Sequence, residues 1–124
     1  MSMEFCCALH NYLIFTDGSK IDGLVDASFV VFYRDDCCPV AIQSFRLAGQ
    51  CTVFQAEVFA IKKASEWIVA NNIIDVQIIS DLKSAIQSIC KIYSYNRIIQ
   101  EIFRTFTGYC GHLCFAWTKS HGME

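Results

Sequence analysis

The feature that most constrains the fold is the order of periodic segments along these 124 residues. Three strand-like runs come first, at 12–15, 27–33 and 40–47. A helical pattern covers 53–69, and it is followed by a strand-like run at 75–80, two further helical patterns and a last strand-like run at 112–117. The first three runs predict an antiparallel meander, whereas the fourth has to cross over and pair in parallel. We therefore expect an α/β fold with a mixed five-stranded sheet and flanking helices.

Turn and capping residues set the expected boundaries. The first strand is expected to end in a turn at Asp17-Gly18, since Asp-Gly is a common hairpin signal. Thr52 and Gln55 have the spacing of a capping box and predict the start of the first helix, and an Asn pair at 71–72 predicts its end. The second helix covers 82–89. The third is expected to begin at Ser94 or Asn96 and to end near residue 108.

Composition excludes several classes of protein. No apolar run approaches the roughly 18 residues of a membrane span, and the N-terminus lacks the basic flank of a signal peptide. We therefore expect no membrane contact and an intracellular location, cytoplasmic or nuclear rather than secreted. Eight cysteines without a signal peptide favour reduced thiols over a disulfide framework. The net charge of −2 gives no general attraction to nucleic acid, so such binding needs local basic patches.

A zinc site is suggested by the run Cys110-Gly-His112-Leu-Cys114, but strand geometry argues against it. All three side chains share one face of a strand, yet the two cysteines lie about 13 Å apart at the usual rise per residue. Zinc–sulfur bonds are only about 2.3 Å long. The sequence therefore predicts no zinc site made of these three residues.

Glu57 is the residue whose position is hardest to explain by packing. On a helical wheel with Phe54 at zero, Glu57 falls at about 300°, between Ala64 and Ile68 in the apolar stripe. Burying a carboxylate there without a partner costs several kcal/mol or forces protonation. A salt-bridged or edge-exposed Glu near the helix N-terminus is the alternative explanation.

Two aspartates become meaningful beside Glu57. Asp17 follows the first strand and Asp81 follows the fourth, although each also suits a purely structural role, as a turn residue and as a helix N-cap respectively. If the first and fourth strands are neighbours and the first helix crosses them, the three carboxylates converge at the carboxyl ends of the strands. Oxygen ligands of this kind suit Mg²⁺ or Mn²⁺.

The motifs together resemble a type 1 ribonuclease H domain, of the kind found in non-LTR retrotransposon polyproteins. They are Phe15-Thr-Asp-Gly-Ser-Lys20, Phe45-Arg-Leu47, Val53-Phe-Gln-Ala-Glu-Val-Phe-Ala-Ile-Lys62, Ile79-Ser-Asp-Leu-Lys-Ser-Ala85 and Trp117-Thr-Lys-Ser-His121. The resemblance places the domain at 11–124 after an extension at 1–10. It implies that the chain is truncated before the family's last helix, which carries a fourth aspartate.

The resemblance also implies a function and a set of site residues. The expected activity is endonucleolytic hydrolysis of the RNA strand of RNA–DNA hybrids by two bound Mg²⁺ or Mn²⁺ ions. The expected partner is nucleic acid, within a larger reverse transcriptase polyprotein. The resemblance assigns metal binding and catalysis to Asp17, Glu57 and Asp81, catalysis also to His121, and substrate contacts to Gly18, Ser19, Lys20 and Gln55.

Two alternatives remain open on the sequence. Without the fourth carboxylate, the chain is alternatively an inactive remnant that at most binds nucleic acid. Another metal nuclease of the same fold, such as an exonuclease or an integrase-type enzyme, is disfavoured by the Gln-Ala-Glu helix that follows the three-strand meander.

Overall fold

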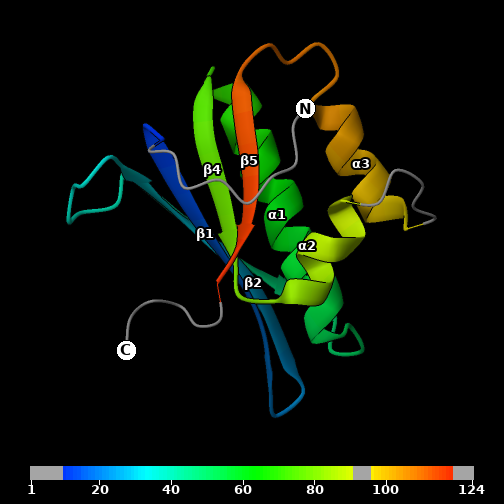
Figure 1. The fold of residues 1–124 in the computed structure, drawn as a ribbon. Helices are drawn as coiled ribbons and strands as arrows, with labels where there is room; N and C mark the ends of the chain where they lie inside the picture. Colours follow the sequence, from blue (N-terminus) through cyan, green and yellow to red (C-terminus); the bar gives the residue numbers. More distant parts are fainter. Residues whose placement is uncertain (1–9, 91–95, 119–124) are drawn as a thin grey trace.

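The chain forms a five-stranded mixed sheet whose strand order brings the first and fourth strands together (Figure 1). The computed structural model describes residues 10–90 and 96–118. The order in the sheet is β3-β2-β1-β4-β5. The strands are β1 (Tyr12–Ile21), β2 (Leu24–Tyr33), β3 (Ala41–Leu47), β4 (Asp75–Ser80) and β5 (His112–Trp117). β1, β2 and β3 pair antiparallel, and β4 pairs in parallel with both β1 and β5, which confirms the predicted meander and crossover.

The prediction that the first strand ends at Asp17-Gly18 is wrong. β1 continues to Ile21, and Asp17 pairs with Ser28 of β2. The hairpin turn lies at the second Asp-Gly pair, where Asp22 and Gly23 have φ values of 52° and 78°. A two-residue turn with positive φ at both central positions is the type I′ turn that matches the twist of the flanking strands. What ends near Asp17 is the parallel pairing with β4, whose last pair joins Thr16 to Ser80.

Three helices complete the described fold: α1 (Val53–Ala70), α2 (Lys83–Cys90) and α3 (Arg97–Thr105). The Thr52–Gln55 capping box is confirmed, because each side chain accepts a hydrogen bond from the backbone N–H of the other residue. Asn96 caps α3 by accepting hydrogen bonds from the N–H groups of Ile98 and Ile99. The alternative start at Ser94 lies outside the described residues.

The core lies between the sheet and the helices. α1 packs across β1 and β2, α3 packs against α1, and α2 contacts α1, β4 and β5 (Figure 1). Alternate residues of the three parallel strands supply the buried face: Ile14, Val76, Ile78, Leu113 and Phe115. A separate cluster of Val25, Ala27, Ala56 and Ala60 joins α1 to β2. Its small alanines let the start of α1 lie close to the sheet. No helix among the described residues is both long and apolar enough to cross a membrane.

Candidate metal centre

The three carboxylates expected from sequence converge in space. One oxygen from each of Asp17, Glu57 and Asp81 lies within 4.8 Å of the others. Asp17 is the first residue of β1 beyond its pairing with β4, Asp81 directly follows β4, and Glu57 lies in the first turns of α1. The helix crosses the strand pair at the end where the parallel pairing stops, which is where ligand sites of open α/β sheets form.

Glu57 is held by two hydroxyl groups that the sequence reasoning did not single out. Its side chain is 1% exposed. Its Oε2 accepts a hydrogen bond from Ser80 Oγ at 2.8 Å and another from Thr16 Oγ1. Both donors are buried as well. The Oε1 atom is thus the oxygen that these hydrogen bonds leave for a further ligand. A usable signal was present: Thr16 and Ser80 each immediately precede one of the two aspartates.

The loop that carries Asp81 is fixed from two sides. Ser80 Oγ accepts a hydrogen bond from the N–H of Leu82 at 3.1 Å, so the same hydroxyl joins the loop to Glu57. Trp117, at the end of β5, donates its indole N–H to the backbone carbonyl of Asp81 at 3.2 Å. Lys83 places its ammonium 5.1 Å from the centre of the Trp117 ring, within range of a cation–π contact. These contacts hold the residue after β4 in place.

Electrostatics at the group favour a cation. Burial raises the pKa of Glu57 above its ordinary value, the hydrogen bonds from Thr16 and Ser80 partly oppose that rise, and the charges of Asp81 and Asp17 add to it. A carboxyl group in this setting either keeps its proton or gains a positive partner. A divalent cation bound between the three carboxylates would offset the desolvation penalty and the mutual repulsion.

Gly18 allows α1 to approach β1. A Cβ atom on Gly18 would lie 2.5 Å from the backbone nitrogen of Glu57 and 2.9 Å from two atoms of Ala56. Because backbone atoms cannot move aside as a flexible side chain can, the helix would have to shift. The glycine between Asp17 and Ser19 therefore sets the distance between the strand and the helix that supply the first two carboxylates.

We expect Gly18→Ala to lower the free energy of unfolding by about 1–3 kcal/mol, the usual cost of overpacking. Urea denaturation followed by circular dichroism measures this cost. Ser19→Ala, at the next position of β1, is the control and should change stability by less than about 0.5 kcal/mol. Equal stability of Gly18→Ala and wild type would contradict the close approach.

The other site residues expected from the sequence are not part of the acidic group. Ser19 and Lys20 lie on β1 beyond the end of β4, and Lys20 is exposed. Gln55 is exposed on the first turn of α1, where its carbonyl oxygen takes part in the capping box. His121 lies outside the described residues.

Comparison with known proteins gives the fold and no closer relationship. No protein-family profile matches the chain, and no curated protein matches it. Among solved structures, RNase H1 from the archaeon Halobacterium salinarum superposes with a TM-score of 0.70 at 17% identity, over 86% of this chain and 84% of that chain. LC11-RNase H1, solved in complex with an RNA/DNA hybrid, gives a TM-score of 0.71 at 16% identity, with the same coverage.

A third structure agrees with these two. The N-terminal RNase H domain of a Mycobacterium tuberculosis protein, solved as a fusion with maltose-binding protein, gives a TM-score of 0.73 at 12% identity, over 86% of each chain. The TM-scores establish a shared architecture, whereas identities this low say nothing about activity, which has to be argued from the site itself. The chain has the RNase H-like fold, with an acidic group at the carboxyl ends of its central strands.

Proposed function

We propose that this domain is a metal-dependent endonuclease that hydrolyses the RNA strand of RNA–DNA hybrids. The observation that carries the proposal is the buried Glu57 beside Asp17 and Asp81 at the end of the β1–β4 pair. A packing role does not account for a carboxylate in the apolar stripe of α1 with two further carboxylates next to it. The similarity of fold to an RNase H1 that was solved with an RNA/DNA hybrid supports the choice of substrate.

The donor set fits Mg²⁺ or Mn²⁺. All three candidate ligands are carboxylate oxygens, which hard divalent cations prefer. The pKa of the buried Glu57 is raised, and a bound cation would lower it by stabilising the ionised carboxylate. When bound, a pair of such ions supplies an activated water and stabilises the leaving oxygen in phosphodiester hydrolysis. We assign all three carboxylates as ligands.

The remaining residues either hold Glu57 in place or are proposed to contact the substrate. The hydroxyls of Thr16 and Ser80 hold one oxygen of Glu57, so the carboxylate keeps a single orientation. In the described sheet β4 stops opposite Thr16, so the β4-facing edge of β1 at Gly18 and Ser19 is not paired with a strand. Backbone groups on that edge, together with Lys20 and the amide of Gln55, are proposed to contact the phosphate backbone.

The origin and context of the domain rest on the sequence motifs. The Val53-Phe-Gln-Ala-Glu helix and the Trp117-Thr-Lys-Ser-His121 motif support a retrotransposon-type domain that works beside a reverse transcriptase. His121 is proposed as an additional catalytic residue on the same basis.

A strand-labelled hybrid tests the function. In Mg²⁺ we expect cleavage of the labelled RNA strand and an intact DNA strand, and chelation of the metal should stop the reaction. An RNA duplex and a DNA duplex of the same sequence serve as matched substrates. Cleavage that persists without metal, or that does not distinguish the hybrid from the DNA duplex, would contradict the proposal.

A binding measurement on the same hybrid separates the alternative, an inactive hybrid-binding remnant. Binding with no turnover at any Mg²⁺ or Mn²⁺ concentration would favour that alternative. Turnover that depends on the metal favours the nuclease.

A further inference from the structure

A second group of metal-ligating side chains lies at the opposite end of the sheet. His10, His112 and Cys114 each offer a ligand atom, and these atoms lie within 4.8 Å of one another. His10 and Cys114 are buried and His112 is exposed. The group adjoins the start of β4 at Asp75, whereas Asp81 follows its end, about 20 Å away along the strand. It is therefore separate from the three carboxylates.

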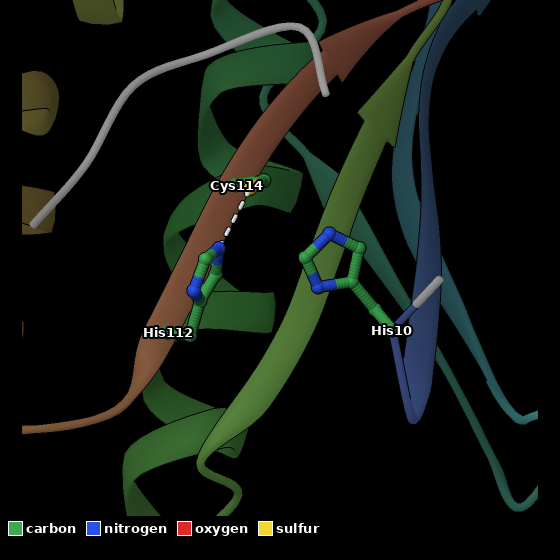
Figure 2. A group of neighbouring side chains, drawn as sticks. All are labelled: His10, His112 and Cys114. Carbon is green, nitrogen blue, oxygen red and sulfur yellow. Dashed lines mark hydrogen bonds between the residues drawn. The ribbon is translucent and has the colours of Figure 1, made fainter. Parts of the chain in front are cut away.

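The strand arrangement explains why these residues meet (Figure 2). His112 and Cys114 are two positions apart on β5, so their side chains share one face, and His112 Nε2 lies 3.3 Å from Cys114 Sγ. His10 lies two residues before the first residue of β1 and on the other side of β4, with its ring centre 5.3 Å from that of His112. A tetrahedral zinc ion with ordinary bond lengths holds its nitrogen and sulfur ligands about 3.5 Å apart. The 3.3 Å between His112 Nε2 and Cys114 Sγ is close to that value.

Asp75 orients His10 as a carboxylate orients a metal-bound imidazole. His10 Nδ1 lies 2.8 Å from Asp75 Oδ1, and the other oxygen of Asp75 accepts a hydrogen bond from the N–H of Asn11 at 3.3 Å. When Nδ1 donates its proton to the carboxylate, the tautomer is fixed and Nε2 carries the ligand lone pair. A carboxylate bound to the far nitrogen of a histidine is the usual outer partner of a zinc ligand.

We propose that His10, His112 and Cys114 form a binding site for a borderline-soft divalent metal ion of the Zn²⁺ class. Two imidazoles and a thiolate select such ions over Mg²⁺, which prefers the oxygen ligands at the other end of the sheet. The three ligands found among the described residues are one fewer than the four of a tetrahedral zinc site. The exposed position of His112 gives an ion access to the group from solvent.

The site was not visible in the sequence because its ligands come from both ends of the described chain. The spacing argument that rejects zinc at Cys110, His112 and Cys114 still holds for Cys110, which is exposed and is not part of the group. His10 takes its place. A bound ion would join the segment before β1 to β5 across β4, linking two strands that are not neighbours in the sheet.

Cobalt is a suitable probe, since Co²⁺ bound to a thiolate gives a near-ultraviolet charge-transfer band and tetrahedral Co²⁺ gives intense visible bands. Titration of reduced, metal-free protein with Co²⁺ alone should produce both bands at one equivalent, and added Zn²⁺ should abolish them. Cys114→Ala should lose the charge-transfer band. His112→Ala, at an exposed position where folding should persist, should bind at least about tenfold more weakly.

Two further variants make the test specific. Cys110→Ser changes an exposed thiol in the same stretch of chain and should leave both bands unchanged. Asp75→Asn should keep the bands but require about 10- to 100-fold more metal, because the ligand set is intact and only its orientation is lost. A charge-transfer band that survives in folded Cys114→Ala, or that disappears in Cys110→Ser, would overturn the assignment. So would the absence of tetrahedral bands from wild type in excess Co²⁺.

Discussion

Asp81→Asn should reduce cleavage of the RNA strand of a hybrid more than about a hundredfold, and Asp17→Asn should do the same. Loss of an outer-shell partner of a metal already costs about 10- to 100-fold, so loss of a ligand should cost more. Each substitution keeps the size of the side chain, removes its charge and replaces one acceptor oxygen by an NH₂ donor. The turnover rate in saturating Mg²⁺, measured with a strand-labelled hybrid, checks this expectation.

The control for these variants is Asp26→Asn. Asp26 lies on β2, pairs with Ser19 in the sheet, and forms an exposed ion pair with Arg46. Exposed pairs contribute about 0–1 kcal/mol, so this variant should fold and cleave like wild type. Circular dichroism should show all three variants folded. Full turnover by Asp17→Asn and Asp81→Asn would remove these carboxylates from the reaction.

Glu57→Gln should make the metal-free protein more stable at neutral pH while abolishing cleavage. The glutamine carbonyl can accept the hydrogen bonds from Thr16 and Ser80, and its amide can face the two aspartates without repulsion. A neutral side chain of equal size avoids the desolvation cost of the ionised carboxylate and its repulsion from Asp81 and Asp17. We expect at least about 1 kcal/mol, or several degrees in the melting temperature for a domain of this size.

The raised pKa of Glu57 also predicts how the stability of the metal-free protein changes with pH. Burial raises the pKa of Glu57 in the folded state, so the folded protein holds the proton more tightly than the unfolded chain does. The free energy of unfolding should therefore fall as pH rises from the ordinary value of Glu57, near 4.5, through the raised one. Glu57→Gln should remove this fall, and Mg²⁺ should reverse it in wild type by binding the ionised form.

Glu66→Gln is the matched control, since it makes the same change on an ion-paired, partly exposed side chain of α1. It should alter stability by less than about 1 kcal/mol and should not alter its pH dependence. If Glu57→Gln is less stable than wild type across the whole pH range, Glu57 is not a carboxylate held at an energetic cost.

Much of the fold could be predicted because local signals agreed with the tertiary structure. The Thr52–Gln55 capping box fixed the start of α1, and the single strand between helices required a parallel crossover. The end of β1 could not be predicted, because Asp-Gly occurs at both 17–18 and 22–23 and periodicity does not choose between them. Pairing with β2 determines where β1 ends, because it continues to Ile21, well beyond Thr16, the last residue that pairs with β4.

The candidate site also has one part that could be predicted from the sequence and one part that could not. The helical wheel placed Glu57 on the buried face of α1, and the strand order then brought Asp17 and Asp81 to it. The hydroxyl donors Thr16 and Ser80 were missed: their positions immediately before the two aspartates were the available signal, but a Thr or Ser in a strand does not reveal which side chain it bonds. Residues drawn together from opposite ends of the chain, as His10 and Cys114 are, leave no local pattern at all.

The central claim is that Asp17, Glu57 and Asp81 together hold a divalent cation. A crystal of the protein grown in excess Mn²⁺ tests it most directly, because the anomalous signal of manganese locates the ion without reference to activity. We predict an anomalous peak roughly 2.0–2.3 Å from an oxygen of each carboxylate. A crystal in which Mn²⁺ is bound elsewhere, or nowhere, while no crystal contact blocks this group would contradict the claim.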